Sequence, residues 1–297
     1  MEEEIVVQEI DIGSVIIDTI NTLCQSLFSS VEEAVFPLLD KLVFIREDIA
    51  TTHYLERIIG TDTNTGLLVL ANALLFAFII YYSARLIMSP YSGQPVESPY
   101  QFFIKSIFIA IFMNCSLSIC ITIVSATSDI TDFVSSLSNN IFKTSATFSS
   151  LIEMIDSSKA NFNVFSINGI LSGVLSMSSL SLIISFALRY IMVKVLILLS
   201  PFAILCLLNH TTTGLFKSWY KCFLTLLILQ IFISLIMLLP YAIIKETTES
   251  PMRELLLVGT IMALLKANGY VKEIMGGLGI SNNFQAGIGG IKSMFMR

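Results

Sequence analysis

Residues 222–244 read CFLTLLILQIFISLIMLLPYAII, an apolar run that contains no charged side chain. An α-helix rises about 1.5 Å per residue, so a helix of this length crosses a hydrocarbon core of about 30 Å. A second run, GLLVLANALLFAFIIYYSARLIM over residues 66–88, ends in tyrosines and an arginine. Such side chains favour the membrane–water interface. Both runs therefore predict membrane-spanning helices.

The composition of the whole chain agrees with this prediction. The chain has 297 residues, of which 55% are hydrophobic and only 13% are charged. A soluble domain usually carries about 25% charged residues, because its surface must face water. We therefore expect an all-α, polytopic membrane helical bundle with about five transmembrane helices.

Three more apolar stretches complete this set of predicted spans. One covers residues 102–124, and the last, over residues 255–265, is short for a crossing unless the bilayer thins. The stretch between them leaves two alternatives open. It forms either one helix over about 181–208, or a hairpin with helices over 170–188 and 195–208.

The distribution of charge chooses between these alternatives. With five spans, the N-terminal arm, residues 125–180 and residues 245–254 share one side, which collects 20 acids and 7 bases. The other side consists of residues 85–105, 209–221 and 266–297, and it collects 2 acids and 8 bases. Basic residues concentrate on the cytoplasmic side of a membrane, so we expect the N-terminus outside and the C-terminus inside. The hairpin alternative would instead place acidic and basic segments together on the same side of the membrane.

Residues 12–40 predict an amphipathic helix that precedes the spans. Apolar residues such as Ile16, Leu23 and Leu27 recur at helical spacing, and Asp18 lies among the polar residues between them. This helix either lies on the bilayer or on its own chain, or docks a partner subunit. The predicted parts are an extracytoplasmic amphipathic arm (1–64), two transmembrane helices with a cytoplasmic loop (65–124), an extracytoplasmic loop (125–180), the C-terminal transmembrane helices (181–267) and a basic, Gly-rich cytoplasmic tail (268–297).

Arg189 and Lys194 are the candidate functional residues within the spans. A charged side chain at the bilayer centre costs about 3 kcal/mol on insertion scales, and it usually faces the bundle interior or water. One interpretation is that both residues line an aqueous path or a seam between subunits. The alternative is that Arg189 extends outward to the interface and the helix begins later. In the hairpin arrangement, both would be ordinary turn residues.

The sequence lacks the residue patterns of common enzymes. The two histidines, His53 and His210, lie far apart, and no HExxH, GxSxG or CxxC pattern occurs. The C-terminal glycines are not a phosphate loop, because Ile291 stands where such a loop needs a glycine directly before Lys292. We therefore expect no enzymatic activity, no catalytic residue, no cofactor and no metal site.

Three short motifs in the C-terminal half resemble a known family. They are LLSPFA over residues 198–203, KSWYK over residues 217–221 and VKEIMGGLGIS over residues 271–281. The residues of these motifs and their order along the chain are similar to those of the TrbL-type polytopic subunit of type IV secretion and conjugation systems. The residues that carry the resemblance are Ser200, Pro201, Trp219, Gly276, Gly277 and Gly279.

The resemblance implies a multi-pass subunit of a translocation channel in the bacterial inner membrane. Such subunits work as homo-oligomers with other membrane subunits, stalk or pilus-like components and ATPases, which together move DNA–protein substrates. The basic tail would face the cytoplasm. Lys266, Lys272 and Lys292 would then lie near anionic lipid, where each base is worth about 1 kcal/mol, or near an ATPase partner.

Two other classes of membrane protein remain open from the sequence. An ion or small-molecule transporter usually shows paired repeats with broken helices at matching positions, and no second copy of any motif is found here. The remaining class is a structural, pore-forming membrane scaffold.

Overall fold

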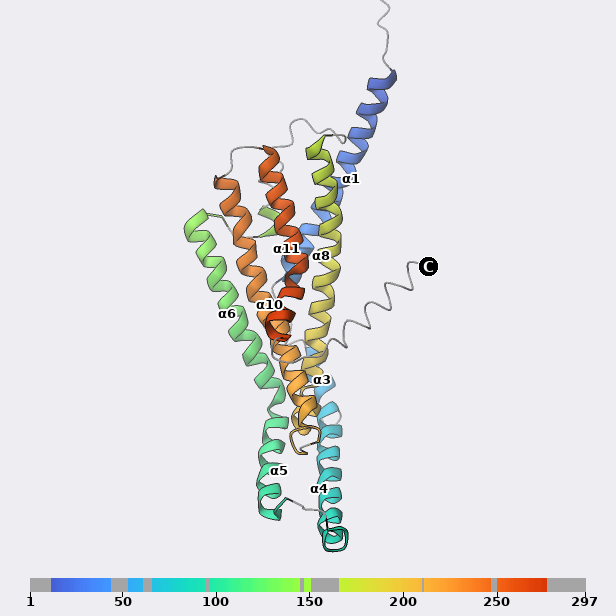
Figure 1. The fold of residues 1–297 in the computed structure, drawn as a ribbon, viewed down its shortest axis with the longest axis vertical. Helices are drawn as coiled ribbons and strands as arrows, with labels where there is room; N and C mark the ends of the chain where they lie inside the picture. The colour runs from blue at the N-terminus through green and yellow to red at the C-terminus, as the bar shows by residue number, and fades with distance from the viewer. Residues whose placement is uncertain are drawn as a thin grey trace, which may run out of the picture. The chain divides into compact units, whose positions relative to one another are not determined.

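The computed structural model describes residues 12–43, 53–60, 66–93, 97–144, 147–150, 166–209, 211–246 and 250–276. Regular structure in these ranges is helical throughout (Figure 1). The prediction of an all-α, polytopic bundle is therefore confirmed. The main helices are α1 (Ile12–Val43), α3 (His53–Ile59), α4 (Leu67–Ser92), α5 (Pro99–Asn114), α6 (Ser116–Phe142), α8 (Ile167–Leu198), α9 (Ser200–Leu205), α10 (Thr213–Glu246) and α11 (Ser250–Gly276).

Four of the described helices are long and apolar enough to cross a membrane. Their candidate spans are Leu67–Tyr91, Ser116–Phe142, Gly173–Leu198 and Thr213–Ile243. The fifth predicted span falls in α11, where the apolar stretch Val258–Ala267 is shorter. At about 1.5 Å per residue, α8 and α10 are about 50 Å long, so their ends extend beyond a hydrocarbon core of about 30 Å.

The second predicted span has different limits in the structure. The chain leaves the α-helix at Cys115, so the expected span over residues 102–124 is divided between α5 and α6. Helix α6 then continues to Phe142, well into the segment expected to be a loop over residues 125–180. Since α8 begins at Ile167, most of the described part of that segment is helical.

Residues 170–198 belong to one continuous helix, which resolves the alternative between a single span and a hairpin. The break comes later, between Leu198 and Ser200. Pro201 has no backbone N–H and starts the short helix α9, so the ladder of α8 hydrogen bonds cannot continue through it. Arg189 and Lys194 therefore lie inside a helix and not in a turn.

The chain divides into two compact units, which are described separately. Unit 1 comprises Met1–Val43, Val134–Phe186 and Ser234–Lys266, and unit 2 comprises Phe44–Phe133, Ala187–Ile233 and Ala267–Arg297. Helices α6, α8, α10 and α11 contribute residues to both.

In unit 2, helices α4 and α5 form an antiparallel pair that packs against α9 (Figure 1). Ala71 and Met113 are fully buried in the cluster that joins these three helices. Asn72 Nδ2 donates a hydrogen bond across the pair to Asn114 Oδ1 at 3.4 Å. A second cluster joins α6, α8 and α10 through Val124, Val193 and Leu227, each at most 1% exposed.

The end of α3 and the start of α4 lie close together within unit 2. Gly66 has φ +156°, a conformation that side chains disfavour, and a Cβ added there would lie 2.6 Å from the Cα of Gly60. The absence of a side chain at Gly66 thus allows its backbone to approach that of Gly60 closely.

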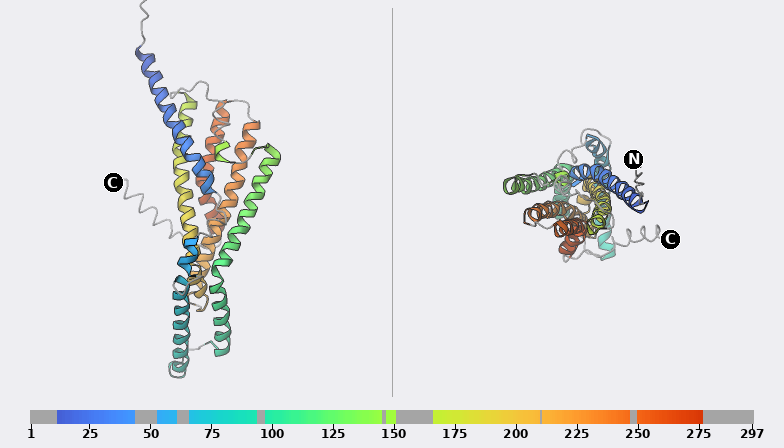
Figure 2. Two further views of the ribbon diagram at one scale, coloured as in Figure 1. Left: turned by 180° about the vertical axis from the view of Figure 1, so that it is seen from behind. Right: turned by 90° about the horizontal axis from the view of Figure 1, so that it is seen from above.

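In unit 1, α1 lies beside the first half of α8, as the views from behind and from above also show (Figure 2). Phe28 of α1 packs on Gly173 of α8, where an added Cβ would meet the Phe28 ring at 3.3 Å. Near the other end of α1, Phe36 and Leu39 are buried, at 1% and 0% exposure. These contacts show that α1 is anchored on the bundle of its own chain.

Candidate functional site

Helix α8 carries both candidate charged residues within its candidate span, but it places them differently. Arg189 is only 4% exposed and lies inside unit 2. Lys194 is half-buried, and its Nζ lies 4.7 Å from the centre of the Tyr190 ring. This distance is typical of a cation–π contact, which partly compensates an ammonium group for lost water. The structure therefore does not bring the two charges together in one cluster.

Arg189 faces the same side of α8 as the buried cluster of unit 2. It lies one helical turn before Val193, which packs with Val124 of α6 and Leu227 of α10. One turn beyond these two partners lie Ser128 and Gln230, which are 9% and 0% exposed. Because α6 and α10 run antiparallel to α8, these polar residues come at the level of Arg189. Thr127 and Thr131 of α6 are also buried, and we call the five the polar layer: Arg189, Thr127, Ser128, Thr131 and Gln230.

The threonine hydroxyls in the polar layer bond within their own helix. Thr127 Oγ1 donates to the carbonyl of Ile123, and Thr131 Oγ1 donates to that of Ser128, both at 2.8 Å. Such bonds let threonine sit inside an apolar helix at little cost. Intramembrane charges such as Arg189 usually face the interior of a helical bundle, and they generally mark assembly or transport functions. The polar layer is therefore the best candidate site inside the membrane.

The motif residues Ser200, Pro201 and Trp219 build the turn between α8 and α10. Ser200 is 0% exposed, and Pro201 is buried beside it. Trp219 Nε1 donates to the carbonyl of Leu196 at 3.0 Å, and its ring stacks on Phe223 at 5.6 Å between ring centres. Leu196 is in the last turn of α8, where carbonyls lack helical partners, so the indole caps this helix.

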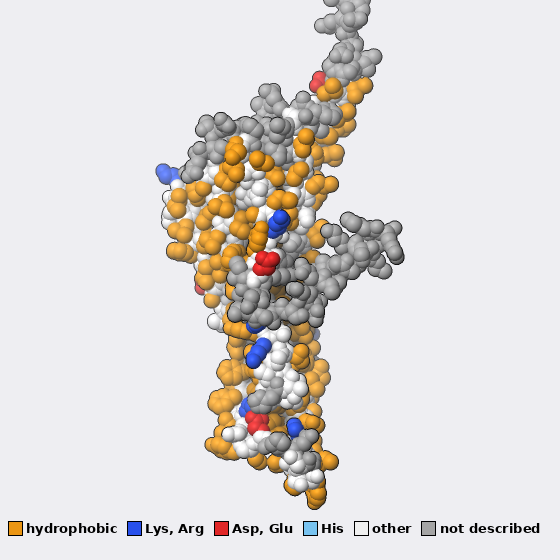
Figure 3. All heavy atoms as spheres, in the orientation of Figure 1, with side chains coloured by type: hydrophobic (Ala, Val, Ile, Leu, Met, Phe, Trp, Pro, Cys, Tyr) orange, Lys and Arg blue, Asp and Glu red, His pale blue; other side chains and the backbone are white. Residues whose placement is uncertain are grey.

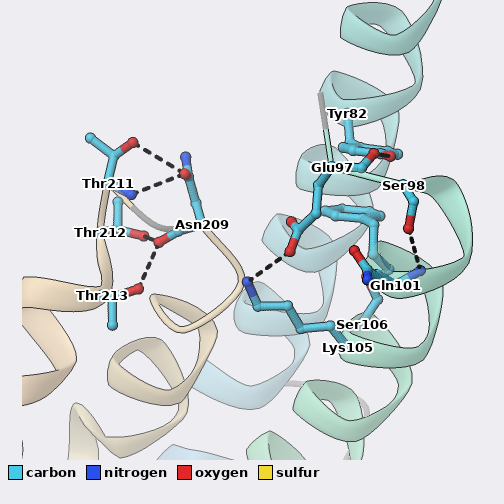
Figure 4. Close-up of polar contacts among 11 residues, drawn as sticks. Tyr82, Glu97, Ser98, Gln101, Lys105, Ser106, Asn209, Thr211, Thr212 and Thr213 are labelled. Carbon is cyan, nitrogen blue, oxygen red and sulfur yellow. Dashed lines mark hydrogen bonds and ion pairs between the residues drawn. The ribbon is translucent and has the colours of Figure 1, made fainter. Parts of the chain in front are cut away.

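Polar side chains make contacts beside two helix connections of unit 2, that between α9 and α10 and that between α4 and α5 (Figure 4). Asn209 Oδ1 accepts from the backbone N–H of Thr211 at 3.1 Å and from its hydroxyl at 3.2 Å. In the other connection, Lys105 Nζ lies 3.9 Å from Glu97 Oε1. The Tyr82 hydroxyl donates to the Glu97 carbonyl at 2.5 Å, while its ring stacks on that of Phe102 in α5.

A second polar site, in unit 1, fastens residues 147–150 to α1 and α10. Asp40 accepts hydrogen bonds from the backbone N–H groups of Phe148 and Ser149, at 2.6 and 3.1 Å, and from the Ser149 hydroxyl at 2.5 Å. The Tyr241 hydroxyl donates to the Thr147 carbonyl at 2.6 Å, and the Thr147 N–H donates back to it at 3.0 Å. We call this set the clasp: Asp40, Thr147, Phe148, Ser149, Ser150 and Tyr241.

The remaining predicted residues belong to α11 or follow it in the sequence. Lys266 is exposed, and Gly276 is the last residue of the helix. Gly277, Gly279 and Lys292 fall outside the described residues, as does the side chain of Lys272. Within the described ranges, no group of three or more His, Cys, Asp or Glu side chains is placed to hold a metal ion.

The family of TrbL/VirB6 plasmid conjugal transfer proteins matches residues 118–276, more than half of the chain. The chain belongs to this family. The match to the TrbL/VirB6 family includes almost all of α6 and the whole of α8–α11, and with them the polar layer and the Trp219 cap. It confirms the predicted membership, and makes the chain a multi-pass membrane component of conjugal transfer. A comparison with curated proteins finds no match.

The sequence interpretation missed two parts of these sites. Thr127, Ser128 and Thr131 were assigned to a polar loop, because a Ser/Thr-rich stretch has low hydropathy whether or not it is helical. The clasp joins Asp40 to residues more than 100 positions away, and nothing near Asp40 in the sequence signals this pairing. Gln230, by contrast, stands out as the amide in an otherwise apolar run.

Proposed function

We propose that this TrbL/VirB6 protein is a non-enzymatic scaffold subunit that helps to form the translocation channel in the bacterial inner membrane. The burial of Arg189 within a candidate span carries this proposal. A charge in that position is costly, so its presence indicates a role in assembly or transport. An enzyme would instead need reactive groups that converge at one site. In this proposal, ATPase partners supply the energy for transfer.

The homo-oligomeric state and the remaining partners belong to the same proposal. The exposed side chains along α4 and α5 are largely apolar, including Phe76, Ile80, Phe103 and Phe112. In a membrane, such side chains contact lipid or other subunits. The extracytoplasmic components would meet α1 and the loop that follows α6, while Lys266, Lys272 and Lys292 would face the cytoplasm.

Deletion of the gene and complementation in donor cells test this function. Transfer of the plasmid to recipient cells should fall by at least 1,000-fold on deletion and return with the wild-type gene. Purification of the tagged chain in mild detergent should recover secretion ATPases and other membrane subunits. Normal transfer in the deletion strain would contradict the proposal. Purification of the chain alone with a bound solute would instead favour a transporter.

A further inference from the structure

Helix α1 has two apolar stripes, and only one of them is used within its own chain. The stripe that packs on unit 1 runs through Phe28, Val35 and Leu39, of which the last two are 6% and 0% exposed. The second stripe lies about 120° further around the helix, at 3.6 residues per turn. Its members are Ile16, Ile20, Leu23 and Leu27, which are 53%, 37%, 58% and 62% exposed.

The second stripe has the spacing of a helix–helix seam. Its residues follow one another at intervals of four, three and four, which is the alternation of a and d positions in a heptad repeat. The stripe then continues through the small residues Ser30 and Ala34, which permit a close approach of two helices. Hydrophobic side chains along this helix reach the surface in the space-filling view (Figure 3).

Polar groups beside the stripe do not oppose a contact between helices. The hydroxyls of Thr19, Thr22 and Ser26 each donate to a carbonyl of α1 itself, at 2.8 to 2.9 Å. They therefore need no water and no outside partner. The positions that flank the seam are uncharged, because Ile17, Thr19, Cys24 and Ser26 occupy the e and g sites.

The charged residues of α1 argue against a contact between the second stripe and lipid. Helices that lie on a membrane surface usually carry Lys and Arg on their polar face, where anionic lipids attract them. The one basic residue of α1 is Lys41 in its last turn, far from the stripe, and Asp18 is the charged residue closest to the stripe. At a heptad f position, Asp18 points away from the seam, so a second copy of the same helix meets no like charge across it.

We propose that the stripe formed by Ile16, Ile20, Leu23 and Leu27 packs against the same stripe of a second copy of this chain. This inference rests on the proposed function, since it names the surface through which the subunits associate outside the membrane spans. The anchoring of α1 on its own bundle holds the stripe in one orientation. Membrane attachment of both copies raises their effective concentration, which compensates for the short length of the seam.

Disulfide cross-linking in membranes of transfer-competent donor cells tests the proposal. Leu23→Cys and Leu27→Cys, each in a full-length Cys24→Ser background, should give a covalent dimer on mild oxidation. Thr22→Cys is the matched control, because it is exposed on the polar side of the same turn. We expect at least fivefold more dimer from the stripe positions. Equal yields at all three positions, no dimer at the stripe, or cross-links to a different protein would overturn the proposal.

A charge pair separates self-packing from any other contact. Leu27→Lys or Leu27→Glu in every copy should reduce the Leu23→Cys dimer at least fivefold. Co-expression of the two variants, with tags of different size, should restore the mixed dimer, because opposite charges then meet. The proposal would be overturned if the single-charge variants gave an undiminished dimer yield, or if co-expression of the two did not restore the mixed dimer. If deletion of the gene still abolishes transfer, the proposed function stands without it.

Discussion

At the scale of single residues, the hydroxyl of Tyr241 links α10 to residues 147–150 in the clasp. Its hydroxyl bonds both backbone groups of Thr147 and lies 2.5 Å from Ser150 Oγ, while its ring contacts Phe142. Tyr241→Phe keeps the ring and leaves Thr147 without this partner, at a cost of about 1–3 kcal/mol. The midpoint of thermal unfolding in detergent should fall, whereas Tyr220→Phe, at an exposed position, should leave it unchanged. Equal midpoints for the two variants would contradict the role of the clasp.

Arg189 allows stability and function to be separated at one position. Arg189→Met keeps an unbranched side chain and removes a charge that is costly in a membrane span, so the variant should still insert and fold. Plasmid transfer should nevertheless fall at least tenfold if the guanidinium serves assembly or transport. Leu188→Met, on the exposed face of the same helix, is the control. Full transfer by Arg189→Met would refute a functional role for this charge.

At the scale of elements, the Trp219 cap holds the turn between α8 and α10. Trp219→Phe retains an aromatic ring to stack on Phe223 but removes the hydrogen bond to the Leu196 carbonyl. The loss should be about 0.5–1.5 kcal/mol of unfolding free energy. Trp219→Leu also removes the stacked ring and should cost more. Denaturant titration of the purified chain measures both, and the reverse order would show that the cap is not the main contribution.

Gly173 controls how closely α1 approaches α8. Gly173→Leu places a side chain where the Phe28 ring already lies within 3.3 Å of a Cβ, so overpacking should cost about 1–3 kcal/mol and displace α1. Gly259→Leu is the matched control in α11, since an added Cβ there has no neighbour within 4 Å. Limited proteolysis should release residues 1–43 faster from the first variant only. Equal rates of release would contradict the close packing.

The sequence predicted helices better than it predicted where they end. Long apolar runs located α4, α8 and α10, because lipid selects apolar side chains along a whole span. The break at Cys115 and the unbroken course of α6 from Ser116 to Phe142 escaped prediction, since hydropathy indicates whether a side chain faces lipid or water and not which conformation its backbone adopts. Ser and Thr in α6 bond their own backbone carbonyls, which keeps a polar stretch helical.

The same distinction applies to the candidate sites. Arg189 could be identified as a candidate because a charged residue within an apolar stretch can be recognised from its sequence neighbours alone. Its burial, and the partial exposure of Lys194 five residues later, depend on which face of α8 packs on α6 and α10. The clasp depends on tertiary contacts between distant segments, so local sequence rules contain no information about it.

At the scale of the whole molecule, the orientation in the membrane follows from the span formed by α8. If α8 crosses the bilayer completely, the end of α6 and the start of α10 lie on opposite sides. The distribution of basic residues predicts that the start of α10 lies in the cytoplasm. Asn140 and Ser218 are exposed near these two helix ends and therefore report on opposite sides.

Asn140→Cys and Ser218→Cys test this orientation in a background that lacks Cys24 and Cys115. A maleimide that cannot cross membranes, added to spheroplasts, should label Asn140→Cys at once. Ser218→Cys should react only after detergent opens the membrane, because the basic start of α10 is retained inside. Labelling of both from the same side would mean that α8 does not cross. Labelling of Ser218→Cys alone would invert the orientation, and with it the assignment of the basic tail to the cytoplasmic ATPases.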